Sequence, residues 1–312
     1  MRAAVLHAYG EPPQPGEFPE PHAGEGQVVV DVLAGGLNPV DLFIASGRFY
    51  GGAPPLPSVA GREGVGRLPD GTRVLFGQCV APYGSFAERT LIDAAAAIPV
   101  PDTVPDELAV GLWTAGLAAI VPFERIAPLS GGERVLVLGA SGAVGQLAVQ
   151  VARLLGAGRV VAAARSPQGR KRALDLGADA AVAIEADSDL GAALLDACDG
   201  GFDVILDLLY GPPLLGALQA AAPWARVAQV GNAAAPEVTL PAAALRRANV
   251  SLIGYQGGLL QPGERVAAYL QLLDHATAGR LLLETERVPL ARVEEAWRRQ
   301  ASSPGRKLVI VP

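Results

Sequence analysis

The fold of this chain is decided by the stretch Arg134-Val-Leu-Val-Leu-Gly139-Ala-Ser-Gly142-Ala-Val-Gly145-Gln-Leu-Ala-Val-Gln-Val-Ala-Arg-Leu-Leu-Gly156. An apolar run of strand length ends at Gly139, two further glycines follow at three-residue spacing, and a helical pattern begins. Five apolar side chains of that pattern share one face, as in a helix packed on a sheet: Val144, Leu147, Ala148, Val151 and Leu155. A glycine turn that leads into a helix presents free backbone N–H groups, to which a pyrophosphate binds. The pattern predicts a nucleotide site, with a turn that binds nothing as the alternative.

Composition limits the possible classes of protein. At 312 residues the chain exceeds the usual size of a single core, so two domains are expected. The net charge of -6 argues against a general nucleic-acid surface, and no apolar stretch reaches the roughly 18 residues of a membrane span. Cys79 and Cys198 are far apart and provide no disulfide framework, which suits a reducing compartment. We therefore expect a cytoplasmic protein that binds neither nucleic acid nor membrane.

The first third of the chain has the pattern of a β-rich domain. Short strands are expected at Gln27–Leu33, Gly64–Arg67, Arg73–Phe76 and Ser85–Leu91, separated by turns rich in Gly, Pro and Asp. A helix should start just after Asn38, because the following proline disfavours a helical backbone at that residue. Many short strands at close spacing suggest a partly open barrel that ends near residue 110.

The next segment alternates between strands and helices. Residues 107–120 are apolar at helical spacing and should form one helix. Strands are then expected at Arg134–Leu138, Arg159–Ala164, Ala180–Ile184, Phe202–Leu206, Arg226–Val230 and Val250–Tyr255, with helices at Gln168–Leu176, Leu190–Ala197 and Pro213–Ala221. This alternation predicts a doubly wound parallel sheet, in which a ligand lies at the carboxyl ends of the strands. Four residues stand at such ends: Gly139, Arg165, Asp207 and Gly231.

The end of the second of these strands indicates which nucleotide binds. A NAD site usually carries an acidic residue about 20 residues past the glycines, which holds the ribose 2′-OH. Here Arg165 and Ser166 follow the strand, and the first acidic residue after the strand is Asp175. Guanidinium groups bind phosphate through charge-assisted bonds, so we predict NADPH, with Arg165, Ser166 and Arg170 at the 2′-phosphate. The alternative is that Arg170, Lys171 and Arg172 form a solvated helix face.

Several motifs occur together in one order: Gly36-Leu-Asn38-Pro-Val-Asp41-Leu-Phe-Ile-Ala-Ser46-Gly47, Gly84-Ser-Phe-Ala-Glu88, Trp113-Thr114-Ala115, the glycines 139–145 and Gly177-Ala-Asp179. Over essentially the whole chain they resemble the zinc-free quinone oxidoreductase (zeta-crystallin-like) branch of the medium-chain dehydrogenase/reductase superfamily. The resemblance implies an α/β protein with two domains: a GroES-like, partly open β-barrel catalytic domain (residues 1–110 plus 257–312) and a doubly wound parallel Rossmann domain (residues 111–256). It also implies an active cleft between the domains and a homodimer, often formed through the sheet of the cofactor domain.

The motif and the resemblance together define a set of cofactor-binding residues. It comprises Gly139, Ala140, Ser141, Gly142, Ala143, Val144 and Gly145 in the turn, Arg165, Ser166 and Arg170 after the second strand, Gly231 and Asn232 after the fifth, and Lys307 near the C-terminus. Lys307 is included because Gly305-Arg306-Lys307 resembles the closing Gly-Lys of the family.

No metal site is expected. His7, His22 and His275 are the only histidines, and neither cysteine has a second cysteine or histidine at a ligand-like spacing. Where the zinc enzymes of the superfamily place a cysteine, this sequence resembles the quinone oxidoreductase pattern, with Asn38. Without a Lewis acid, oxidation of an unactivated alcohol lacks its usual stabilisation of the alkoxide.

The remaining chemistry is hydride transfer from NADPH to an electron-poor acceptor. The resemblance places Asn38 and Thr114 near the nicotinamide, and Tyr50 takes over the acceptor contact if it replaces the family tyrosine that is Phe49 here. The favoured acceptor is a quinone. The first alternative is reduction of the C=C bond of enals, enones or enoyl thioesters, with Tyr50 or Tyr255 as proton donor. The second is an NADPH-binding protein without turnover.

Overall fold

The computed structural model describes residues 1–186 and 188–312, and the chain divides into two compact units. Unit 1 comprises Met1–Thr114 and Tyr269–Pro312, and unit 2 comprises Ala115–Ala268. The first boundary therefore follows residue 114 instead of residue 110, and the second follows residue 268 instead of residue 256. The second boundary lies within helix α9 (Pro262–Thr277).

Unit 2 contains a six-stranded parallel sheet in the order β11-β10-β9-β12-β13-β14. Its strands are β9 (Arg134–Leu138), β10 (Arg159–Ala164), β11 (Ala180–Ala183), β12 (Phe202–Asp207), β13 (Ala221–Gln229) and β14 (Ser251–Gly254). The order reverses between β9 and β12, which is the switch point at which doubly wound sheets bind nucleotides. The sequence-based prediction of this fold is confirmed.

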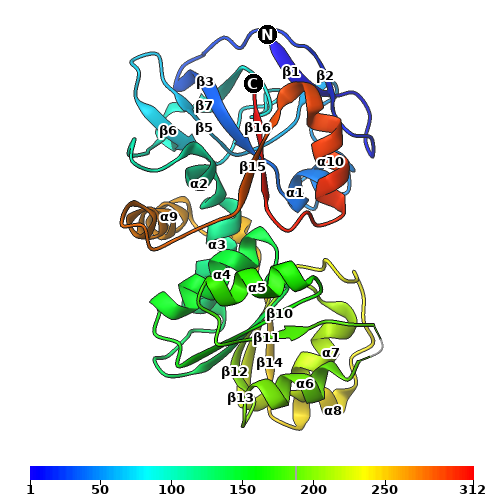
Figure 1. Ribbon diagram of the computed structural model, residues 1–312. Coiled ribbons are helices and arrows are strands. Elements are labelled where there is room, and N and C mark those ends of the chain that lie inside the picture. Colours follow the sequence, from blue (N-terminus) through cyan, green and yellow to red (C-terminus); the bar gives the residue numbers. More distant parts are fainter. Residues whose placement is uncertain (187) are drawn as a thin grey trace. The chain divides into compact units, whose positions relative to one another are not determined.

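Helices cover both faces of this sheet (Figure 1). The helices α4 (Ala143–Leu154) and α5 (Pro167–Asp175) lie on one face, and α6 (Leu190–Ala197), α7 (Gly211–Gln219) and α8 (Ala242–Arg246) lie on the other. Leu194 and Leu214 of the second group pack with Leu136 and Ile205 of the sheet in one buried cluster. The shorter elements of the unit are the π-helix η2 (Pro122–Ile126) and the 3₁₀-helix η3 (Gly257–Leu259).

Unit 1 contains two sheets. The strands β1 (Arg2–Leu6), β2 (Gln14–Glu17) and β4 (Ser58–Val59) form the smaller one. The larger runs β15 (Thr285–Pro289), β16 (Lys307–Val311), β3 (Gln27–Gly36), β5 (Gly64–Arg67), β6 (Arg73–Phe76) and β8 (Ile98–Pro99), and β7 (Arg89–Asp93) pairs with β3. Because β16 pairs with β3, the C-terminal tail completes a sheet that the N-terminal segment begins.

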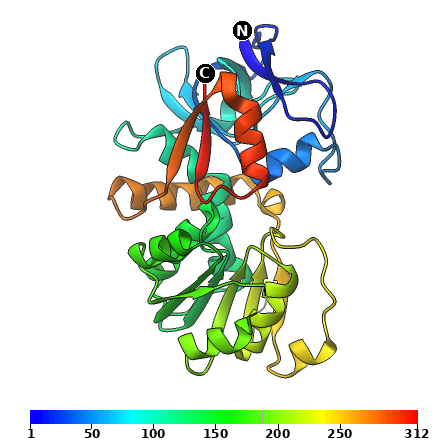
Figure 2. The ribbon, with the colours of Figure 1, turned by 45° about the vertical axis from the view of Figure 1, so that its right-hand side comes forward.

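The helices of unit 1 are α1 (Pro39–Ala45), α2 (Asp106–Gly111) and α10 (Val293–Ala301), with the 3₁₀-helices η1 (Ala94–Ala96) and η4 (Leu290–Arg292). Figure 2 shows α10 beside β15 and β16, where Trp297 packs on Leu308 and Ile310 in a buried cluster. One predicted strand is shifted, since β7 starts at Arg89 instead of Ser85. The amide of Phe86 donates to the Ala60 carbonyl, so the residues before β7 pair with a different segment.

The helix expected over residues 107–120 is two helices, α2 and α3 (Thr114–Val121). The backbone N–H of Thr114 donates to the Glu63 carboxylate at 3.0 Å. The Thr114 N–H therefore does not donate to a carbonyl of α2, so α2 does not continue through this residue. A second helix starts at Thr114.

Candidate functional site

The turn between β9 and α4, residues 139–145, is named the glycine turn. Gly139 has a φ of +95°, a conformation that favours glycine, and the amides of Gly139 and Ala140 donate to the Ala163 carbonyl at 2.9 and 3.0 Å. A Cβ at Gly145 would lie 2.5 Å from the Gly139 carbonyl oxygen, so only glycine lets α4 approach the strand this closely. At Gly142, the residue before α4, the nearest atom to a Cβ would be 3.9 Å away. The glycine turn thus combines tight packing at Gly145 with free space at Gly142.

The segment after β10 lies against the glycine turn. A Cβ at Gly169 would be 2.4 Å from the Ser141 Cβ, which brings the first turn of α5 next to it. Ser166 starts α5, since its hydroxyl accepts the Gly169 N–H at 3.0 Å. Arg165 is exposed, and its side chain has no hydrogen bond or ion pair among residues 1–186 and 188–312. One guanidinium of the expected pair is therefore available to a ligand anion.

The other basic residues of this segment are engaged. Arg170 donates to the carbonyls of Ala164 at 3.2 Å and Arg165 at 2.7 Å, at the end of β10. Lys171 forms an exposed ion pair with Asp175 at 2.8 Å. The solvated helix face considered in the sequence analysis describes Lys171 well.

The ends of β12 and β13 complete this edge of the sheet. Asp207 is fully buried, and its Oδ1 accepts the amides of Leu209 and Tyr210 at 2.9 Å each. Burial raises the pKa of Asp207 above its ordinary value. The Gly231 amide donates to the Asp207 carbonyl at 3.3 Å, whereas Asn232 is exposed. Since β10, β9, β12 and β13 are neighbours in the sheet, the four strand ends expected from the sequence meet at one edge, as predicted.

Unit 1 contains a buried polar cluster, named the Glu63 network, made of Asn38, Glu63, Thr114 and Lys307. The Lys307 ammonium donates to Glu63 Oε1 at 2.7 Å and to Asn38 Oδ1 at 2.6 Å. Asn38 Nδ2 donates to Glu63 Oε1 at 2.9 Å and to the Gly36 carbonyl at 3.1 Å. Thr114 donates to Glu63 Oε2 through both its amide and its hydroxyl. The network therefore brings together two expected catalytic residues, Asn38 and Thr114.

Lys307, which the resemblance assigns to the cofactor, is engaged inside unit 1. Its side chain is 1% exposed, as is that of Glu63, and its ammonium binds inside the Glu63 network. A contact between Lys307 and a cofactor would require these bonds to open, so that contact stays a prediction. The role of Lys307 in the described structure is to hold Asn38 and Glu63.

Asp41 lies beside the Glu63 network and caps α1. Its Oδ2 accepts the Asn38 N–H at 2.7 Å, so the side chain acts as a structural cap of the helix. Burial, reinforced by the nearby Glu63 carboxylate, raises the pKa of Asp41 to about 7. The two thiols show no catalytic setting, since burial raises the pKa of Cys79 to about 12 and also raises that of Cys198.

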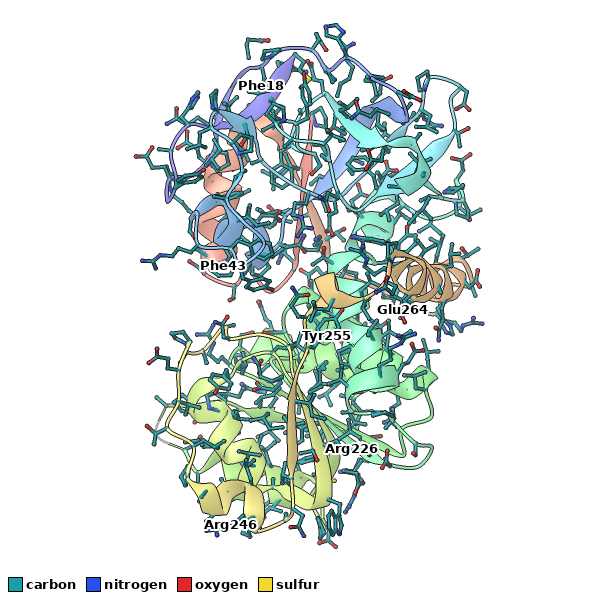
Figure 3. All side chains as sticks on the ribbon, turned by 180° about the vertical axis from the view of Figure 1, so that it is seen from behind. Phe18, Phe43, Arg226, Arg246, Tyr255 and Glu264 are labelled. Atoms are coloured by element: carbon teal, nitrogen blue, oxygen red, sulfur yellow. The ribbon has the colours of Figure 1, made fainter. Side chains whose placement is uncertain are left out.

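Tyr50, the third expected catalytic residue, lies outside the Glu63 network. It is 69% exposed, and its ring centroid is 4.4 Å from that of Phe49 and 6.0 Å from that of Phe43. Phe43 projects from α1 (Figure 3) and is itself 41% exposed. The structure thus groups the exposed rings of Phe43 and Tyr50 with the half-buried ring of Phe49, and these three residues are named the exposed aromatic group.

Tyr255, the other expected proton donor, follows β14 in unit 2. It lies at the carboxyl edge of that sheet, whereas Arg226 lies toward the opposite edge (Figure 3). Burial raises the pKa of Tyr255 to about 12, which makes it a weaker proton donor than an exposed tyrosine.

The part of the chain that the structure describes contains no group of three His, Cys, Asp or Glu side chains that could hold a metal ion. None of its helices combines the length and the apolar composition needed to cross a membrane.

Sequence reasoning missed the central role of Glu63. Its carboxylate joins the other members of the Glu63 network. The one sign of this role in the sequence is its place: Glu63 is an acidic residue directly before the strand β5, and the first three residues of that strand are buried in the structure. That signal alone does not identify partners as distant as Thr114 and Lys307.

Two protein-family models match the chain. The alcohol dehydrogenase GroES-like domain matches residues 24–102, and the zinc-binding dehydrogenase domain matches residues 143–275. Among curated proteins, quinone oxidoreductase-like protein 2 of Mus musculus is 30% identical over 267 residues, which cover 83% of this chain and 76% of that protein. A phenolphthiocerol/phthiocerol polyketide synthase subunit of Mycobacterium tuberculosis is 32% identical over 303 residues, and the chain spans only 14% of its length.

A solved structure agrees over the full length of both chains. The quinone oxidoreductase from Thermus thermophilus, described together with its NADPH complex, has a TM-score of 0.85 and 32% identity, and the match covers 100% of each chain.

Proposed function

Because the chain belongs to the quinone oxidoreductase-like branch of the medium-chain dehydrogenase/reductase superfamily, we propose that it is an NADPH-dependent oxidoreductase whose acceptor is a quinone. The observation that carries the proposal is the glycine turn together with Arg165, whose guanidinium has no partner among residues 1–186 and 188–312. The full-length similarity to the Thermus thermophilus quinone oxidoreductase supports both NADPH as the donor and a quinone as the acceptor.

The residues of unit 2 fit NADPH. Free space over Gly142 and the first amides of α4, which have no acceptor within a helix, suit a pyrophosphate. Arg165 and Ser166 suit the 2′-phosphate, because an exposed guanidinium and a hydroxyl both donate to it. Arg170 donates to the backbone carbonyls at the end of β10, and we assign it the role of holding the backbone that carries Arg165. Gly231 and Asn232 follow β13 and are assigned to the nicotinamide side.

The chemistry follows from this assignment. Bound NADPH supplies a hydride to the acceptor. The protein binds and orients the two reactants and excludes water. A quinone takes up the hydride and one proton and leaves as the hydroquinone. We propose that the reaction needs no zinc, since Asn38 stands where the zinc enzymes place a cysteine.

The acceptor is assigned to the exposed aromatic group. Tyr50 offers a hydroxyl with no hydrogen-bond partner in the described residues, and the rings of Phe43 and Phe49 offer apolar area to a planar molecule. Asn38 is assigned a supporting role, because both hydrogens of its amide are already donated inside unit 1.

The alternative function is NADPH-dependent reduction of a C=C bond in enals, enones or enoyl thioesters. The similarity to a segment of a polyketide synthase favours it. This reaction needs a proton donor, and Tyr50 suits the role better than Tyr255, whose pKa burial raises to about 12.

We also propose a cytoplasmic homodimer. The edge strand β14 pairs only with β13 among residues 1–186 and 188–312, and its Ile253 is 39% exposed. An unpaired edge with an exposed apolar side chain can bind the same strand of a second copy. Sedimentation equilibrium tests this, and an Ile253→Lys variant should be monomeric.

The test of the main proposal follows NADPH absorbance in purified protein with ortho-quinones, para-quinones and 2-alkenals, with NADH as control donor. We expect rapid oxidation by quinones and little oxidation of NADH. The variant Gly142→Ala should keep its melting temperature and raise the KM for NADPH at least tenfold, as its methyl group would enter the space assigned to the pyrophosphate. Preference for alkenals would replace the proposal with the alternative, and NADPH binding without any oxidation would leave a non-catalytic binding protein.

A further inference from the structure

The Glu63 carboxylate receives four hydrogen bonds. Oε1 accepts from the Lys307 ammonium at 2.7 Å and from Asn38 Nδ2 at 2.9 Å, and Oε2 accepts from the amide of Thr114 at 3.0 Å and from its hydroxyl. A carboxylate has about four lone-pair sites, so all of them are filled by donors. Glu63 therefore acts in this network only as an ionised acceptor.

Because every acceptor site of Glu63 is filled, the polarity of Thr114 is fixed, where polarity means whether its hydroxyl donates or accepts a hydrogen bond. The hydroxyl has one hydrogen, and that hydrogen is donated to Glu63. Thr114 is half-buried and is the most exposed member of the Glu63 network, whereas Asn38 is 5% and Lys307 2% exposed. What Thr114 can offer to a ligand is a lone pair of Oγ1.

Asn38 has the same polarity for a related reason. The ammonium of Lys307 on one side and the carboxylate of Glu63 on the other fix the orientation of its amide, with Oδ1 toward Lys307 and Nδ2 toward Glu63. Both Nδ2 hydrogens are used, one by Glu63 and one by the Gly36 carbonyl. The Glu63 network thus has no side-chain hydrogen free on Thr114 or Asn38.

We propose that Thr114 Oγ1 is a hydrogen-bond acceptor for the N–H of a ligand carboxamide, such as that of nicotinamide, and that Glu63 is the positioning residue that imposes this polarity. The inference rests on the proposed function and specifies which group of the cofactor Thr114 contacts. A carbonyl oxygen at the same place would face a lone pair of Thr114 and gain no hydrogen bond.

The test compares the binding of two oxidised dinucleotides by equilibrium titration, without turnover. NADP⁺ carries a carboxamide with N–H donors, and its 3-acetylpyridine analogue carries a methyl ketone with none. The native protein should bind NADP⁺ about three- to tenfold more tightly, the range of one neutral hydrogen bond. In Thr114→Val, which keeps the shape and removes the hydroxyl, the two affinities should be equal within twofold. The control Thr114→Ser should restore the preference.

The role of Glu63 is tested separately in the double variant Glu63→Gln/Lys307→Met, which removes both buried charges together. Its glutamine can donate to Thr114, which frees the hydroxyl hydrogen for a ligand. The preference for NADP⁺ over the analogue should then narrow or reverse, while both dinucleotides still bind.

An unchanged preference in Thr114→Val would overturn the inference and leave the proposed function standing. If the native protein binds neither dinucleotide, the proposed function and the inference both fail. A preference that persists in the double variant would show that Glu63 does not set the polarity of Thr114.

Discussion

The glycine turn of unit 2 and the Glu63 network of unit 1 differ in what they are made of. The turn is backbone, held by the conformation of Gly139 and by the closeness that Gly145 permits. The network consists of side chains and contains a buried ion pair whose partners are 244 residues apart in the sequence. A backbone site is encoded by a short local pattern, whereas a side-chain network depends on the completed fold.

The comparison also predicts how each region responds to substitution. Removing one partner of a buried ion pair leaves an uncompensated charge, which costs more than an added methyl group at a tight turn. The Glu63 network should therefore be the more sensitive region in stability, and the glycine turn the more sensitive one in cofactor binding.

The largest effect is expected for Lys307→Met. The substitution leaves Glu63 ionised and buried with one donor fewer, and the free energy of unfolding should fall by about 3–5 kcal/mol. Urea denaturation of the native and variant proteins measures the loss.

The double variant Glu63→Gln/Lys307→Met is the matched control, since it removes both charges. Its stability should recover at least half of the loss, because paired replacement of buried charges is often close to neutral. A double variant as unstable as Lys307→Met would show that packing of the lysine stem, and not charge, controls this site.

The second prediction concerns Asp41 and pH. The folded pKa of Asp41, about 7, lies above its ordinary value of 3.8, so between these values the folded state holds a proton that the unfolded state releases. The contribution of Asp41 to stability is therefore present below pH 4 and is lost as the pH rises toward 7. Between pH 5 and pH 8 the stability of Asp41→Asn should rise relative to the native protein by about 2–3 kcal/mol.

Urea denaturation at the two pH values checks this prediction. The other charged groups that act on Asp41 are Glu63, Lys307 and Arg62, and all three are kept in the variant. The asparagine can still accept the Asn38 amide through its side-chain oxygen. A stability difference that is the same at both pH values would contradict the expected titration of Asp41.

Much of unit 2 could be predicted from the sequence. The expected strands at Arg134–Leu138 and Arg159–Ala164 and the helix at Leu190–Ala197 have the predicted bounds. These elements follow from hydrophobic periodicity and from glycine turns, which act over a few residues. The fold and the gathering of the strand ends at one edge of the sheet could be predicted for the same reason.

The Glu63 network could not be predicted, because its members come from four separate segments. The break between α2 and α3 shows the same limit, since it depends on a side chain 51 residues away that accepts the Thr114 amide. Periodicity carries no information about such a partner. The assignment of Lys307 to the cofactor had a related origin, as a terminal Gly-x-Lys pattern says nothing of what covers the lysine.

The third prediction tests the glycine turn. A Cβ at Gly145 would be 2.5 Å from both Ala140 Cα and the Gly139 oxygen, so Gly145→Ala should lower the free energy of unfolding by about 2 kcal/mol. Gly142→Ala is the control, because its Cβ meets nothing closer than 3.9 Å and its stability should be unchanged. Thermal melts of the two variants give the comparison, and equal losses would show that the turn tolerates no side chain at either position.

The smallest effect is expected at the end of β10, where Arg165 and Lys171 carry the same charge in different settings. Arg165 has no partner among the described residues, whereas Lys171 is paired with Asp175 at 2.8 Å. Arg165→Gln should weaken NADP⁺ binding about tenfold, the equivalent of about 1.4 kcal/mol, and leave NAD⁺ binding unchanged. Lys171→Gln, which removes an equal charge from the neighbouring helix face, should change neither by more than twofold. If both variants weaken NADP⁺ equally, the 2′-phosphate responds to the general positive potential of this segment, and the specific contact assigned to Arg165 is wrong.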